Sequence, residues 1–118
     1  MDFKLKVPFE SREAYSKHIR FTFPGKYGVI VQPFKPEEFN ILSKFKFVVD
    51  GNLDLRYFVI KAFRESLKPY GGLFFISLNR DNKSVILNTK ATISMLHEKY
   101  ADEDGLLYIY YLKENTFG

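Results

Sequence analysis

The longest apolar run of the chain lies at residues 106–112, where the sequence is LLYIYYL. Acidic residues precede this run and polar residues follow it. It is too short to span a membrane, and an uninterrupted run of this length is typical of a central strand that is buried on both faces. The pattern therefore predicts that the last strand of the fold lies at the centre of a sheet.

Near the start of the chain, apolar side chains recur at helical spacing. In FESREAYSKHIRFTF, at residues 9–23, one stripe is formed by Tyr15, Ile19 and Phe23, which fall four residues apart. This is the pattern of an amphipathic helix, and the proline-glycine pair after it ends the helix. In residues 3–7, apolar side chains alternate with charges, which leaves a short helix and an extended arm both open.

Turn residues and helix caps divide the rest of the chain into short elements. Asp54 and Thr92 each precede a stretch with helical periodicity and are the predicted N-caps of two helices. The predicted order is a strand at residues 27–34, a strand at 43–50, a helix at 55–67, a strand at 72–79, a short helix at 93–100 and the final strand; SVIL at 84–87 leaves an antiparallel return open.

Two opening strands, a helix and a C-terminal strand laid between earlier strands predict an α+β fold of the ubiquitin-like β-grasp type. We expect a four-stranded mixed sheet around a central helix. Residues 1–24 are the predicted N-terminal helical extension, residues 25–112 the ubiquitin-like domain and residues 113–118 a flexible C-terminal tail. Lysines alternate with apolar residues in SKFKFVVD, at residues 43–50, which predicts a strand at the edge of the sheet.

Composition narrows the class of protein. At 118 residues and 46% hydrophobic, the chain has enough apolar surface for one core and is not a disordered segment. It has no cysteine, which excludes disulfides, a thiolate nucleophile and cysteine-ligated zinc. No secretory signal pattern is present at the start, so we expect a cytoplasmic protein.

The net charge of +4 is unevenly distributed. Residues 1–64 hold twelve Lys and Arg against seven Asp and Glu, a net of +5, whereas residues 65–118 hold six against seven, a net of −1. A basic half suits an acidic peptide, an anionic membrane or nucleic acid. Because the basic residues are spread out and form no arginine-rich run, we expect no specific binding of nucleic acid.

Candidate catalytic chemistry is sparse. His18 and His97 are far apart in the sequence, and the Gly71-Gly72 pair is no phosphate-binding loop. The acidic run of residues 102–104 predicts a solvated turn rather than an acid–base pair. We therefore expect no catalytic residue, no metal, no cofactor and no enzyme activity.

Several segments, in order and spacing, resemble the autophagy-related protein 8 family, which includes the GABARAP and light-chain modifiers. The matching segments are PFESR at 8–12, HIRFTFPGKYGVIV at 18–31, KFVV at 46–49, LFFISLN at 73–79, DEDGLLYIYY at 102–111 and ENTFG at 114–118. These segments are spread over nearly the whole chain, and they imply two N-terminal helices ahead of the ubiquitin-like domain. The chain departs from the family's pattern at Gly28 and Asp50, where proline is usual, and at Tyr15, where an acid is usual.

The resemblance implies a ubiquitin-like modifier of autophagy. Gly118 would be activated by E1-like and E2-like enzymes and joined to phosphatidylethanolamine, which would place the protein on autophagosomal membranes. The folded domain would recruit cargo receptors and adaptors through short acidic motifs of the form aromatic-x-x-aliphatic. Two alternatives are an autophagy-related protein 12-like protein conjugate, although that relative ends in Trp-Gly and this chain in Phe-Gly, and a peptide-binding adaptor that is never conjugated.

The predicted edge strand would accept the motif as an added strand, with one side-chain pocket on each face. The resemblance implies a first pocket formed by Ile19, Ile30, Lys46, Val48 and Leu106. It implies a second pocket formed by Phe47, Val49, Leu53 and Phe58. The acidic residues of the motif would meet Lys26 and Lys44, together with Lys46. A plainer interpretation stays open, in which the lysines guard the edge against aggregation and Ile30, Val48 and Phe58 belong to the core.

Overall fold

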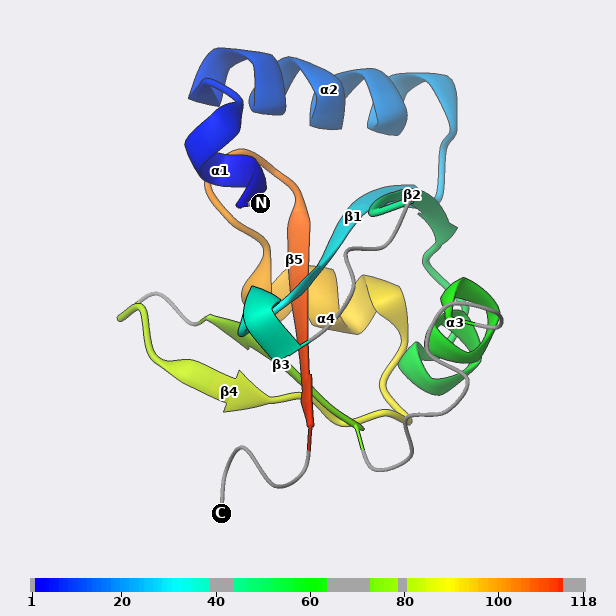
Figure 1. The fold of residues 1–118 in the computed structure, drawn as a ribbon. Coiled ribbons are helices and arrows are strands. Elements are labelled where there is room, and N and C mark those ends of the chain that lie inside the picture. The colour runs from blue at the N-terminus through cyan, green and yellow to red at the C-terminus, as the bar shows by residue number, and fades with distance from the viewer. Residues whose placement is uncertain (1, 39–43, 64–72, 79–80, 114–118) are drawn as a thin grey trace.

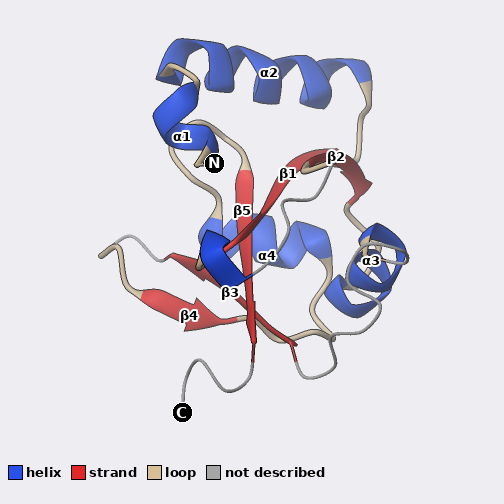
Figure 2. Cartoon of the chain, in the orientation of Figure 1, coloured by secondary structure: helices blue, strands red, loops and turns tan. Residues whose placement is uncertain are grey.

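The computed structural model of the protein describes residues 2–38, 44–63, 73–78 and 81–113 (Figure 1). The elements follow one another in the order expected from the hydrophobic pattern, with a helix at Phe3–Lys6 and a strand at Ser84–Ile86, which the sequence left open, also formed (Figure 2). The elements are α1 (Phe3–Lys6), α2 (Phe9–Thr22), β1 (Lys26–Pro33), a 3-10 turn (Pro36–Glu38), β2 (Lys46–Asp50), α3 (Leu55–Ala62), β3 (Leu73–Leu78), β4 (Ser84–Ile86), α4 (Ile93–Tyr100) and β5 (Leu107–Lys113).

The strands form one mixed sheet in the order β2-β1-β5-β3-β4. β5 pairs in parallel with β1 and antiparallel with β3, so the last apolar run lies at the centre of the sheet, as predicted. β2 pairs antiparallel with β1 and lies at one edge, which confirms the prediction from its lysine alternation.

In the part of the chain that the structure describes, the sheet has five strands rather than the expected four. The additional strand is β4, which pairs antiparallel with β3 through only three register positions, from Ile76 opposite Ile86 to Leu78 opposite Ser84. The sequence left this return open because a segment of this length carries little periodic signal.

The two faces of the sheet carry two separate clusters of buried side chains. On β5, Leu107, Ile109 and Tyr111 belong to the larger cluster, which α3 and α4 cover. Tyr108 belongs to the smaller cluster on the opposite face, together with Phe3 of α1. Because the side chains of β5 alternate between the two faces of the sheet, each face carries a core. Figure 1 shows α1 and α2 on the side of the sheet away from α3.

Local capping fixes where the helices begin. The Asp54 carboxylate accepts a hydrogen bond from the Tyr57 amide at 2.7 Å, and the Thr92 hydroxyl accepts one from the Met95 amide at 3.3 Å. Both predicted N-caps are therefore confirmed. Residues 3–7, which the sequence left open, begin as the short helix α1. Among the described helices, none has the length and hydrophobicity needed to cross a membrane.

Candidate functional site

The edge strand β2 presents backbone groups to its open side. Two hydrogen bonds flank its pairing with β1: the Val31 amide donates to the Phe45 carbonyl, and the Gly51 amide donates to the Gly25 carbonyl, each at 2.9 Å. In an antiparallel pair, hydrogen-bonded positions alternate with positions whose amides and carbonyls point away from the partner.

This alternation assigns the direction of each backbone group along β2. Phe47 and Val49 occupy the hydrogen-bonded positions opposite β1. The amides and carbonyls of Lys46 and Val48 therefore face the open edge of the sheet. An extended peptide can hydrogen-bond to these groups and extend the sheet by one strand.

The side chains of β2 alternate between the two faces as predicted. Lys46 and Val48 are exposed, and Val48 has 42% of its surface accessible, whereas Phe47 is half-buried and Val49 is buried. Val48 lies opposite Gly28 of β1, and Lys46 lies opposite Ile30. Cross-strand partners share a face, so these four residues face the same side of the sheet.

The structure brings the residues of the first predicted pocket together on that face. Ile19 of α2, Ile30 of β1 and Leu106 are almost completely buried, with 0–1% of their surfaces accessible. They converge beside Gly28, where an added Cβ would lie 2.6 Å from Leu106 Cδ2 and 2.9 Å from Ile19 Cδ1. A side chain at Gly28 would therefore displace the floor of this pocket.

Tyr15 packs against the same buried side chains, and Lys46 lies beside the Tyr15 ring. Tyr15 Cε2 lies 4.0 Å from the position that a Cβ of Gly28 would take. The Lys46 ammonium lies 5.4 Å from the centroid of the Tyr15 ring, a cation–π distance. Burial raises the pKa of the Tyr15 phenol. The sequence marked Tyr15 as a departure from the family's pattern, but did not predict that its ring packs against the buried residues of the first predicted pocket.

The residues of the second predicted pocket lie together on the opposite face of the sheet. Val49 and Phe58 are members of the larger core, and Phe47 and Leu53 pack against them half-buried. The rings of Phe47 and Phe58 meet edge to face with centroids 5.3 Å apart. The Lys44 ammonium lies 5.0 Å from the centroid of the Phe47 ring, so a lysine covers this pocket as well.

The two lysines predicted to meet acidic residues are not brought together. Lys44 precedes the start of β2, whereas Lys26 lies opposite Asp50 at the other end of the strand. At about 3.3 Å per residue, the two positions are roughly 20 Å apart along the edge. They can serve acidic residues at opposite ends of a bound peptide, but not the same residue.

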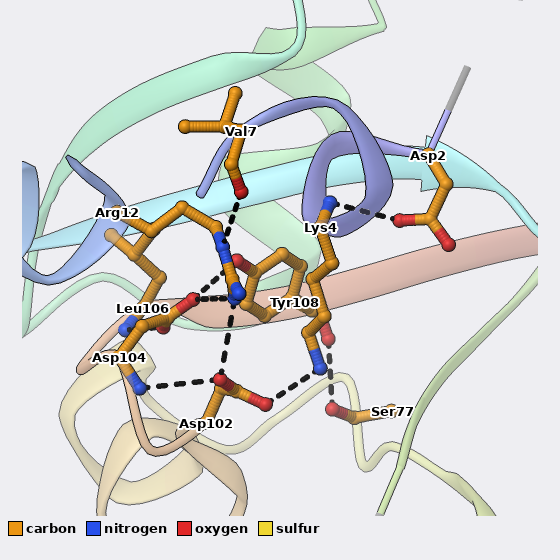
Figure 3. Close-up of polar contacts among 9 residues, drawn as sticks. All are labelled: Asp2, Lys4, Val7, Arg12, Ser77, Asp102, Asp104, Leu106 and Tyr108. Atoms are coloured by element: carbon orange, nitrogen blue, oxygen red, sulfur yellow. Dashed lines mark hydrogen bonds and ion pairs between the residues drawn. The ribbon is translucent and has the colours of Figure 1, made fainter. Parts of the chain in front are cut away.

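A polar network fixes α1 and α2 to the segment that leads into β5 (Figure 3). The fully buried carboxylate of Asp104 accepts hydrogen bonds from Arg12 Nη1 at 2.7 Å, from the Tyr108 hydroxyl at 2.6 Å and from the Leu106 amide at 2.8 Å. Burial and the hydrogen bond to Asp104 raise the pKa of Tyr108 well above its ordinary value, so its hydroxyl stays protonated and donates. Through Asp104, the network fixes the position of α2 relative to Leu106. It therefore positions Ile19 and Leu106, which form the floor of the first predicted pocket.

Asp102 extends this network to α1. Its carboxylate accepts a hydrogen bond from Lys4 Nζ at 2.6 Å and lies 3.8 Å from Arg12 Nη1. Burial opposes the charge of Asp102, but the hydrogen bond from Lys4 and the charges of Lys4 and Arg12 prevail and hold the pKa of this carboxyl below its ordinary value. The expectation of a solvated turn at residues 102–104 was therefore wrong for Asp104, while Glu103 is exposed as expected.

We expect Asp104→Ala to lower the free energy of unfolding by about 3–5 kcal/mol, because it leaves the Arg12 guanidinium without its nearest counter-charge. The Tyr108 hydroxyl and the Leu106 amide lose their acceptor as well. Denaturant unfolding measures the change. The control is the neighbouring exposed residue in Glu103→Ala, which should stay within about 0.5 kcal/mol of wild type. A loss below 1 kcal/mol for Asp104→Ala would show that the network does not hold the helices.

Comparisons with known proteins find relatives over nearly the whole chain. The family model described as "Autophagy protein Atg8 ubiquitin like" matches residues 11–118. Autophagy-related protein 8 of Pichia angusta is 34% identical over 116 residues, which cover 98% of this chain and 90% of that protein. Autophagy-related protein 8d of Arabidopsis thaliana is 32% identical, with 98% and 93% covered.

Solved structures share the fold over nearly its full length. The crystal structure of Trypanosoma brucei ATG8 superposes with a TM-score of 0.79 at 26% identity and covers 94% of this chain and 92% of its own. Plasmodium falciparum Atg8, solved in complex with a Plasmodium falciparum Atg3 peptide, superposes with a TM-score of 0.78 at 25% identity and covers 95% of both chains.

Proposed function

The chain belongs to the Atg8 family of ubiquitin-like autophagy proteins, and from this premise we propose that it is a lipid-conjugated modifier that recruits peptide-bearing partners. E1-like and E2-like enzymes activate Gly118 and join it to phosphatidylethanolamine. The conjugate resides on autophagosomal membranes and the free form in the cytoplasm. The folded domain binds cargo receptors and adaptors through acidic aromatic-x-x-aliphatic motifs.

The observation that carries the binding proposal is the edge strand β2 with an apolar cluster on each face. Backbone groups of Lys46 and Val48 face outward. An added peptide strand directs alternate side chains to opposite faces, so its aromatic and aliphatic residues can reach the two clusters. The Plasmodium relative solved with an Atg3 peptide supports a peptide partner for this fold.

Conjugation rests on family membership and on the match of the family model through Gly118. Gly118 lies outside the described residues, and β5 ends at Lys113. The unconjugated adaptor remains the second candidate function, because it uses the same peptide site and differs only in whether the tail is modified.

Calorimetric titration with a synthetic acidic aromatic-x-x-aliphatic peptide tests the binding proposal. Replacing either anchor of the peptide with alanine should cost about 2 kcal/mol or more, because a buried anchor dominates such interfaces. Lys44→Ala should weaken binding only about two- to fivefold, mainly by slowing association, because its charge is exposed.

The matched control is Lys99→Ala, another exposed lysine, which lies in the last turn of α4 and should leave affinity unchanged. If Lys44→Ala weakened binding more than loss of an anchor, electrostatic attraction would dominate and the pocket assignment would be wrong.

A further inference from the structure

The floor of the first pocket is not open to a ligand. Ile19, Ile30 and Leu106 together expose almost no surface. The Tyr15 ring packs against the buried cluster that contains Ile30 and Leu106. The Lys46 ammonium lies 5.4 Å from the centroid of that ring. Outward movement of the Tyr15 side chain would expose this part of the floor to a ligand side chain.

Tyr15 is held by few interactions. Its ring is half-buried and contacts the pocket residues and the Lys46 ammonium. Within the described part of the chain, no hydrogen bond from its hydroxyl is found. The ring can therefore rotate outward without leaving a buried polar group unsatisfied, and the main loss is its packing and its contact with Lys46.

We propose that Tyr15 is the gate and a specificity-determining residue of the first pocket, and that the aromatic side chain of a peptide binds by displacing the Tyr15 ring from beneath Lys46. This inference rests on the proposed peptide-binding function. The Tyr15 ring occupies the place of the incoming ring in the free protein, so the closed state competes with the ligand.

The chemistry of the exchange selects the class of ligand. When Tyr15 leaves, the Lys46 ammonium loses its aromatic partner. An incoming indole or phenol restores a cation–π contact, whereas an aliphatic side chain does not. Gly28 makes the closed state compact, because Ile19 and Leu106 occupy the space that a side chain there would fill. The favoured first anchor is therefore a planar, electron-rich ring.

The test uses three acidic peptides that differ only at the first anchor, which is tryptophan, leucine or alanine. Removing the competitor in Tyr15→Ala should tighten binding of the tryptophan peptide about two- to fivefold, mostly through faster association. Tyr15→Phe keeps the ring and should stay within about twofold of wild type. Phe21→Ala is the matched control, because Phe21 is another aromatic residue of α2 but is 90% exposed.

Weaker or unchanged binding of the tryptophan peptide by Tyr15→Ala would show that Tyr15 does not compete with the peptide, and it would overturn the proposed gate. If neither wild type nor Tyr15→Ala binds any of the three peptides, the proposed binding function fails and the gate fails with it. Binding by Tyr15→Ala alone supports the gate, because the wild-type pocket is then closed.

A second measurement uses only the wild-type protein, which covers the case of a variant that does not fold. The Tyr15 ring should shift the NMR signals of the Lys46 ε-methylene protons upfield in the free protein. This shift should disappear on saturation with the leucine peptide and persist with the tryptophan peptide. Persistence with the leucine peptide would show that Tyr15 stays in place, which contradicts the gate.

Discussion

Val48→Arg is expected to abolish binding of an aromatic-x-x-aliphatic peptide and to leave the domain folded. Val48 lies on the edge strand opposite Gly28, on the face that carries the first pocket, and 42% of its surface is accessible in the free protein. Arginine can therefore extend into solvent when no peptide is present. A bound peptide would bury the guanidinium beside an apolar anchor without a counter-charge, which should reduce affinity by about a hundredfold or more.

Calorimetry measures the loss, and the melting temperature reports whether the variant remains folded. The matched control is Ile86→Arg, because Ile86 is an exposed apolar residue on β4, the strand at the opposite edge of the sheet. Ile86→Arg should bind the peptide with wild-type affinity. Peptide binding by Val48→Arg within tenfold of wild type would move the binding site away from β2.

Gly118→Ala is expected to remove attachment to membranes in cells. Enzymes that activate a carboxyl terminus must pass the tail through a narrow channel to a cysteine or an ATP phosphate. Glycine has no Cβ, so the backbone can approach closely and the carboxylate meets no obstruction, whereas alanine adds a methyl group beside the reacting carbon. The melting temperature and peptide affinity should not change, because β5 ends at Lys113 and Gly118 follows the sheet.

The lipid-shifted band on gel electrophoresis, confirmed by mass spectrometry of the C-terminal peptide, measures this effect. Thr116→Ala alters the same tail without changing the reacting residue and should be conjugated normally. A lipid-shifted band that persists in Gly118→Ala would leave the unconjugated peptide-binding adaptor, or attachment at another residue, as the function to pursue.

Local patterns were sufficient to predict most of the fold. Asp54 and Thr92 act within three residues of their own positions, so their capping role can be recognised from the sequence. The run at residues 106–112 indicates burial on both faces, and the alternating lysines of the edge strand indicate one exposed face. Each is a property of its own segment. Whether residues 84–87 form a strand could not be decided from the sequence, because the pairing of β4 depends on β3 rather than on its own periodicity.

In the candidate site, too, the orientation of individual side chains could be predicted from local pattern, whereas their roles could not. Alternation along β2 correctly separated Lys46 and Val48 from Phe47 and Val49. Ile30 and Phe58 are buried, as the core interpretation required, while Val48 is accessible at the surface. The roles of these residues in peptide binding stay predictions.

The network around Asp104 could not be predicted from local patterns. Arg12 and Asp104 are separated by 92 positions in the chain. Each is an ordinary charged residue in its own segment, and the pair exists only because the sheet brings α2 to the start of β5. The contact between the Tyr15 ring and the Lys46 ammonium could not be predicted locally either, because the two residues lie on different elements that only the fold brings together.

The central position of β5 also determines when the protein can fold. β1 follows the N-terminal helices, yet its parallel partner is the last strand of the chain. During synthesis, β1 and β3 therefore emerge before the strand that joins them, and the sheet cannot close until residues 107–113 have left the ribosome. Contacts of such long sequence separation slow folding and expose strand edges in the meantime. The nascent chain consequently depends on residues 107–113 both for completing the sheet and for leaving the aggregation-prone state.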